Sequence, residues 1–121
     1  MPNIYIYEVE CLVPSEVVGK WDEWIPKHIQ QILNLEQGLF IKATFNKVTQ
    51  NIEGLPADHS QYVIQYHTDS QEKIDRYIKE HAPKLKQGTT DVFGDKLKTK
   101  RKIYKVDQEF FPQSGQFGYV F

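Results

Sequence analysis

The sequence predicts one α+β domain in which four strands and two helices follow one another in the order βαββαβ. Three observations predict this fold class. Residues 3–11, 39–48, 60–67 and 101–108 are rich in alternating, β-branched or aromatic side chains, as strands are. Two stretches between them carry apolar residues every three or four positions, the spacing of amphipathic helices. The length of 121 residues, with 40% hydrophobic residues, is enough for one core and too short for two.

The first strand and the first helix are predicted from the N-terminal third of the chain. The strand, residues 3–11, has an apolar face made of Tyr5, Tyr7, Val9 and Cys11. Ser15 is a candidate N-cap for the helix that follows. The apolar stripe of that helix comprises Val17, Val18, Trp21, Trp24, Ile25, Ile29, Ile32 and Leu33. Pro26 lies within the stripe and has no backbone donor, so we expect a kink or a break there.

The second and third strands are predicted between Gly38, which ends the helical region, and the second helix. The second strand covers residues 39–48, with one apolar phase made of Leu39, Ile41, Ala43 and Phe45. A loop around residues 54–56 leads to the third strand, residues 60–67, whose core face comprises Tyr62, Ile64 and Tyr66.

The second helix begins at one of two candidate caps. Asp69 has capping-box spacing to Glu72, and Ser70 competes with it. The helical stripe comprises Ile74, Tyr77, Ile78, His81, Ala82 and Leu85. We expect Pro83 to interrupt the helix near its end, residues 87–94 to form a short irregular or helical piece, and residues 101–108 to form the last strand.

This order is typical of the ferredoxin-like arrangement, a four-stranded antiparallel sheet with both helices on one face. An internal similarity at an offset of 53 residues supports it. The positions Lys20, Asp22, Ile25, His28 and Phe40 align with Lys73, Asp75, Ile78, His81 and Phe93. We therefore interpret residues 3–108 as the ferredoxin-like domain and residues 109–121 as an aromatic C-terminal tail.

Charge and composition argue against several partners. With 15 Lys and Arg against 16 Asp and Glu, the net charge of -1 gives no field that would attract nucleic acid or an anionic membrane. Cys11 is the single cysteine, which excludes an intrachain disulfide and favours a reducing compartment, so we expect a soluble cytoplasmic protein. The sequence carries no phosphate-loop, dinucleotide or zincin motif and its four histidines are dispersed, so we expect no cofactor and no metal.

The second face of the predicted sheet, formed by the alternate strand positions, is polar. Its members are Glu8, Glu10, Lys42, Gln65, His67, Arg101 and Lys105. Two interpretations stay open: a polar-lined cavity in a dimer, or a solvated face with cross-strand ion pairs. We interpret the basic run in residues 96–105 as a solvated edge rather than a nucleic-acid patch, because strand alternation divides it between two faces.

Several segments together resemble the domain-of-unknown-function family 4286. They are Ile6-Tyr7-Glu8-Val9, residues 21–29 (WDEWIPKHI), 62–66 (YVIQY), 77–85 (YIKEHAPKL), Phe93-Gly94 and 100–106 (KRKIYKV). The resemblance covers roughly residues 3–108 and implies a dimeric α+β barrel, in which two ferredoxin-like sheets pack face to face. It implies no activity. The loop at residues 49–58 and the tail after Asp107 depart from the family.

The candidate ligand-binding residues are Trp24, His28, Tyr77, His81 and Arg101. His28 and His81 lie at matching places beside the two helical stripes, where a near-neutral imidazole facing a cavity could move a proton or hold a ligand. His28 is the candidate catalytic residue. The simpler alternatives are that each histidine only bonds a carboxylate or a helix turn, and that Trp24 is core.

We therefore predict a homodimeric protein that binds a small molecule, with possible cofactor-free acid/base activity. The alternative is a noncatalytic interaction or regulatory module. A cavity containing Trp24 and a histidine favours the first, whereas filled packing and an exposed aromatic patch favour the second. The tail aromatics, Phe110, Phe111, Phe117, Tyr119 and Phe121, are expected to dock on the domain or on its dimer partner.

Overall fold

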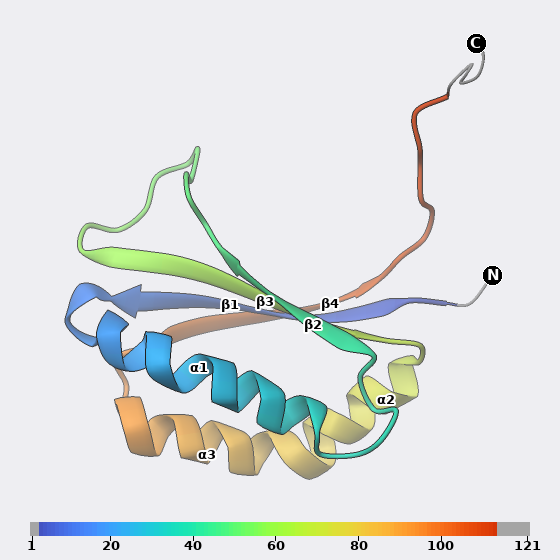
Figure 1. Ribbon diagram of the computed structural model, residues 1–121, viewed down its shortest axis with the longest axis horizontal. Coiled ribbons are helices and arrows are strands. Elements are labelled where there is room, and N and C mark those ends of the chain that lie inside the picture. The colour runs from blue at the N-terminus through green and yellow to red at the C-terminus, as the bar shows by residue number, and fades with distance from the viewer. Residues whose placement is uncertain (1–2, 114–121) are drawn as a thin grey trace.

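Four strands form one antiparallel sheet in the computed structural model, which describes residues 3–113 (Figure 1). The strands are β1 (Tyr5–Pro14), β2 (Lys42–Lys47), β3 (His59–Thr68) and β4 (Lys98–Lys105). Their order in the sheet is β2-β3-β1-β4, and every neighbouring pair is antiparallel. The predicted βαββαβ order and the ferredoxin-like α+β class are confirmed.

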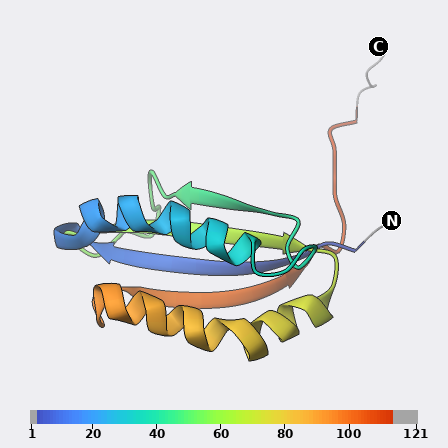
Figure 2. The same cartoon turned by 60° about the horizontal axis from the view of Figure 1, so that its bottom comes forward.

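The helices cover one face of this sheet, as Figures 1 and 2 show. A 3-10 turn, η1 (Ser15–Val17), leads into α1 (Val18–Leu33). The second helical region runs from α2 (Gln71–Arg76) through a π-helical turn, η2 (Tyr77–His81), into α3 (Ala82–Phe93). Within residues 3–113 no helix covers the opposite face, which we call the open face. No helix in this range is long and apolar enough to cross a membrane.

The start and the interior of the first helix differ from the prediction. Ser15 is not a side-chain cap: it is the first residue of η1, and neither η1 nor α1 has a side-chain hydrogen bond at its N-cap. Pro26 does not break α1, which continues to Leu33. Pro26 and Asp22, the residue four positions before it, are both exposed, so the carbonyl without a helical partner lies on the solvent side.

The second helical region also continues past its proline. Pro83 occupies the first turn of α3, directly after η2, so its missing donor falls at the junction between two helical types and α3 extends to Phe93. Residues 87–93 are therefore regular helix. Of the two candidate caps, Ser70 is the N-cap, because its Oγ accepts a hydrogen bond from the Glu72 backbone at 3.1 Å. Asp69 instead forms an ion pair with Lys73 at 2.9 Å.

Two predictions of which way a side chain faces were wrong, one just before β2 and one in β4. Ile41 is 60% exposed, while its neighbour Phe40 is buried, because residues 39–41 precede β2 and do not alternate as a strand. In β4, Arg101 lies opposite Val9 of the helix-covered face. Lys105 lies opposite Tyr5 on the same side. Arg101 and Lys105 were predicted to lie on the polar face of the sheet, and this prediction was wrong. The open face instead receives two other basic residues of β4, Lys100 and Lys102.

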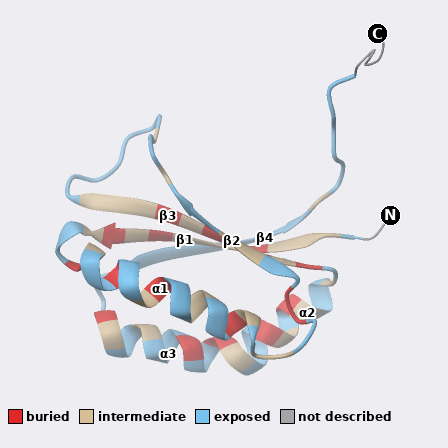
Figure 3. Ribbon diagram, viewed as in Figure 1, coloured by how far each residue is buried: buried red, intermediate tan, exposed pale blue. Residues whose placement is uncertain are grey.

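The core lies between the helices and the sheet (Figure 3). Its fully buried members include Val13, Trp21, Ile25, Leu39, Tyr66 and Ile74. All eight residues of β4 are exposed, so the sheet is well covered at β1 and β3 and open at this edge. Phe110 and Phe111 are 84% and 76% exposed and do not dock on their own domain. The other tail aromatics, Phe117, Tyr119 and Phe121, lie outside the described residues.

Candidate functional site

A cavity of about 60 Å³ lies between the helices and the covered face of the sheet. Four of the five candidate residues line it: Trp24, His28, Tyr77 and Arg101. The fifth, His81, does not line it and belongs to a neighbouring groove. The remaining wall is mostly core side chains from β1, α1, β3 and α3.

Trp24 and His28 form a stacked pair in the wall of the cavity. They are four residues apart on α1, so they lie on one side of the helix. Their ring centroids are 4.3 Å apart with an interplanar angle of 20°. Trp24 also meets Phe93 of α3 edge to face at 5.1 Å. Desolvation lowers the pKa of His28 to about 4, so its imidazole is neutral at neutral pH.

Three tyrosines from three elements line the cavity together with Cys11. Tyr7 of β1 lies 6.2 Å from Tyr66 of β3 and 5.5 Å from Tyr77 of η2, measured between ring centroids. Burial raises the pKa of each phenol, and it raises the pKa of the Cys11 thiol to about 12. These four groups are therefore protonated at neutral pH and can act as hydrogen-bond donors.

Arg101 brings a positive charge to the cavity from β4. Its Nη1 donates to the Thr99 Oγ1 at 2.9 Å. Its charge opposes the upward shift in the pKa of Tyr7, Cys11, Tyr66 and Tyr77, so it acts on all four buried acidic protons. Arg101 lies on the cavity side of the sheet and not on the open face, where it was predicted to lie. This position is what makes Arg101 part of the cavity.

A larger groove of about 510 Å³ lies between α1 and α3, on the outer side of the cavity wall. Trp24, His28 and Leu85 line both spaces, so they form the partition between groove and cavity. The groove brings the two predicted histidines to one surface, with His28 on α1 and His81 at the end of η2.

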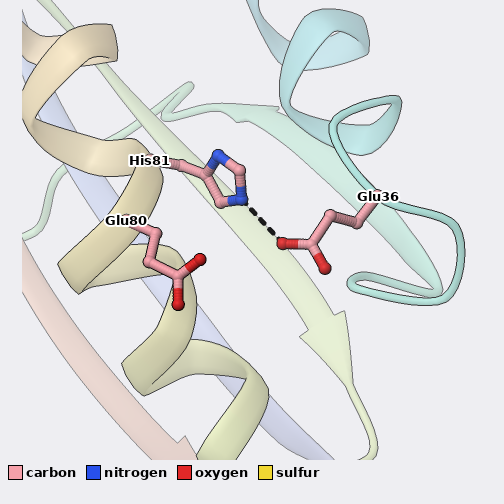
Figure 4. A group of neighbouring side chains, drawn as sticks. All are labelled: Glu36, Glu80 and His81. Atoms are coloured by element: carbon pink, nitrogen blue, oxygen red, sulfur yellow. Dashed lines mark hydrogen bonds and ion pairs between the residues drawn. The ribbon is translucent and has the colours of Figure 1, made fainter.

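His81 takes part in a cluster that sequence reasoning missed (Figure 4). Its Nε2 lies 2.7 Å from the Glu36 Oε2, and the other Glu36 oxygen pairs with the Arg76 Nη2 at 3.0 Å. The hydrogen bond from His81 is the largest cause of a lowered pKa at Glu36. The simpler alternative, a histidine that bonds a carboxylate, therefore describes His81. Glu36 lies in the loop after α1, 45 residues from His81, and no local spacing signals this pair.

Glu80 completes a set of three potential metal ligands with Glu36 and His81, whose ligand atoms all lie within 4.8 Å of one another. The two Glu36 oxygens already contact Arg76 and His81, so the cluster is an ion-pair network that joins the loop after α1 to η2. A divalent cation would have to displace the Arg76 guanidinium. The set was not predicted, because only Glu80 and His81 are adjacent in sequence.

Trp21 provides an unusual donor near the same cavity. Its indole Nε1 is buried and has no hydrogen-bond partner within residues 3–113. The ring is packed among aromatic side chains, with its centroid 5.5 Å from that of Tyr62 and 6.1 Å from that of Phe93. The sequence predicted Trp21 as core, and burial agrees with this.

Comparison with known proteins identifies the domain but no activity. The family model described as "Domain of unknown function (DUF4286)" matches residues 4–106. No curated protein matches the chain significantly. The resemblance predicted from sequence is confirmed by the family match.

Three solved structures share the fold at low sequence identity. A provisionally assigned antibiotic biosynthesis monooxygenase from Nitrosomonas europaea has a TM-score of 0.59 and 13% identity, over 86% of this chain and 90% of that one. Another, from Bacillus cereus, has a TM-score of 0.50 and 9% identity, over 93% and 100%. A de novo designed protein, Foldit4, has a TM-score of 0.50 and 10% identity, over 88% and 99%. At these identities the likeness concerns the fold alone.

Proposed function

The chain belongs to the DUF4286 family, and from this premise we propose that it binds a small molecule in the cavity beneath α1 and α3. The observation that carries the proposal is the composition of the cavity wall. An aromatic and aliphatic lining surrounds a few polar groups, among them His28, Tyr77 and Arg101. Ligand sites in proteins are typically built in this way.

The size of the cavity limits the ligand. Its volume of about 60 Å³ is far below the roughly 300 Å³ at the lower end of sites for drug-sized ligands. The ligand is therefore a molecule of a few heavy atoms, or one whose larger part stays outside. The groove between α1 and α3 offers that outer space, and it shares Trp24, His28 and Leu85 with the cavity wall.

His28 has a binding role in this proposal. A neutral imidazole can donate one hydrogen bond and accept another, but a base with a pKa of about 4 takes up a proton weakly at neutral pH. Acid/base catalysis by His28 therefore needs a ligand that raises its pKa. We keep ligand binding as the primary function and this catalysis as its extension.

A homodimer in a cytoplasmic setting completes the proposal. The open face bears a polar network, in which Glu8 accepts from Gln65 and from Tyr104, both at 2.9 Å. A carboxylate that already accepts hydrogen bonds can be covered by a second copy at a lower desolvation cost. The alternative function, a noncatalytic interaction module, is favoured by one observation: the exposure of Phe110 and Phe111.

Native mass spectrometry of the purified chain tests this proposal, with Ala82→Leu as the comparison. Ala82 is buried in the cavity wall, so the larger side chain occupies the space that the ligand needs. We expect a bound small mass on the natural chain and its loss in the variant. Xenon, which enters small apolar cavities, is the second probe: it should shift the NMR signals of the cavity residues in the natural chain only. A natural chain with no added mass and no xenon response would contradict ligand binding.

A further inference from the structure

The wall of the cavity carries positive charge and no carboxylate. Arg101 and Lys86 both line it, and within the described part of the chain no Asp or Glu does. His28 adds no charge at neutral pH, and the phenols of the wall stay protonated. A ligand therefore meets two fixed positive charges and several neutral donors, which favours an anion over a cation.

Arg101 has unused hydrogen-bonding capacity. Four ion pairs occur between residues 3 and 113, and none of them includes Arg101 or Lys86. The guanidinium has five N–H donors, more than its hydrogen bond to Thr99 and its interaction with the Tyr7 phenol require. Its planar fork matches the two oxygens of a carboxylate, whereas an ammonium has no such preference.

The position of these two cations defines the mouth of the cavity. Lys86 and Thr89 come from α3, and Thr99 and Arg101 come from β4. Figure 2 shows α3 running alongside β4 at this edge of the sheet. Lys86, Thr99 and Arg101 are exposed, while the opposite wall, at Tyr66 and Ile25, is buried. The cavity thus runs from a cationic opening to an apolar interior.

We propose that the cavity takes a small monocarboxylate, with the apolar body directed inward and the carboxylate held by Arg101 at the mouth. This inference rests on the proposed function and adds the class of ligand to it. A cavity of about 150 Å³ holds benzene, so about 60 Å³ holds a body of roughly two or three carbon atoms. Isobutyrate has a body of this size and serves as the probe.

The test is an NMR titration of the nitrogen-15-labelled chain with isobutyrate and with isobutyramide, which has the same shape and no charge. The indole signals of Trp21 and Trp24 report on the cavity, because both rings line it. We expect saturable shifts with isobutyrate and affinity at least about tenfold weaker for the amide. In Arg101→Gln the two probes should bind with similar affinity. Lys100→Gln is the matched control, because it removes one charge from the same strand on the open face.

The outcomes separate this inference from the function on which it rests. Equal affinity of the natural chain for the two probes would leave a ligand site in place and overturn the choice of a carboxylate. An equal loss of isobutyrate affinity in Lys100→Gln and Arg101→Gln would overturn the role of Arg101, since the effect would then come from overall charge. If neither probe shifts a cavity signal, this inference is wrong, and the mass and xenon measurements above decide separately whether the cavity binds anything.

Discussion

At the scale of single residues, the burial of His28 makes the free energy of unfolding depend on pH. Its imidazole is stacked on Trp24 and has a pKa of about 4, against 6.5 for the exposed group. As the pH falls below 6.5, the unfolded chain takes up a proton that the folded chain does not. The free energy of unfolding therefore decreases between about pH 6.5 and pH 4.

His28→Gln is predicted to flatten this dependence, because glutamine does not titrate. Discounted for partial exposure, the loss in the natural chain that His28 causes between pH 6.5 and 4 is about 2 kcal/mol. Urea denaturation at a series of pH values measures it for the two chains. Parallel curves for the natural chain and the variant would show that His28 is protonated in the folded state as readily as in the unfolded one.

The sequence could predict which residue types gather here but not all of their positions. Trp24 and His28 were found because a four-residue spacing on one helix brings side chains together. Arg101 was a candidate but was placed on the wrong face, because strand alternation separates it from Lys100 and Lys102 without showing which set faces the helices. The Glu36–His81 contact had no local signal at all, since it joins a loop to a distant helical turn.

At the scale of elements, two serines at the starts of helical segments differ in their contribution to the free energy of unfolding. Ser70 caps α2 by accepting from the Glu72 backbone, and Ser15 has no such bond. Ser70→Ala is predicted to lower the free energy of unfolding by about 1 kcal/mol, and Ser15→Ala by less than about 0.5 kcal/mol. Urea denaturation of the two variants measures both. Equal losses would mean that the cap at Ser70 contributes no more than an ordinary surface hydroxyl.

The helix boundaries were harder to predict than the helices themselves. The stripes of apolar residues indicated both helical regions, because burial of one face is what stabilises them. The breaks predicted at the two prolines were wrong, because Pro26 lies on the exposed side of α1 and Pro83 follows a π-helical turn. A π-helical turn has no sequence signature in this chain, so its effect on the register of Glu80 and His81 could only be seen in three dimensions.

At the scale of the whole molecule, the exposed aromatics after β4 concern assembly rather than folding. Phe110 and Phe111 are mostly exposed, so replacing both by serine is predicted to leave the free energy of unfolding of the monomer unchanged within about 0.5 kcal/mol. Because they do not dock on their own domain, we expect them to contact a second copy, and the same double variant is then predicted to decrease the dimer fraction. Urea denaturation of a dilute sample and native mass spectrometry give the two quantities.

Ile52→Ser is the matched control for this experiment, because Ile52 is 92% exposed in the loop between β2 and β3. It should change neither quantity. An unchanged dimer fraction in the double variant would show that Phe110 and Phe111 do not contact the second copy. A lower free energy of unfolding in the dilute sample would show that they pack on their own domain in solution.

The fold as a whole was accessible from the sequence, because strand and helix periodicities follow one another in an order that few topologies accommodate. The cavity was accessible only in outline. The sequence offered Trp24 and His28 as residues that could face a cavity, whereas the volume and the mouth of the cavity depend on how Tyr77, Lys86 and Arg101 pack against their neighbours.

The order of the strands also sets the timing of folding during synthesis. β1 is made first, but it lies inside the sheet, between β3 and β4. Its residue Tyr5 is paired with Thr68 on one side and with Lys105 on the other. Contacts this distant along the chain are slow to form, because a long loop must close before they are gained. The chain must therefore emerge from the ribosome as far as Lys105 before β1 can pair along its full length with β4.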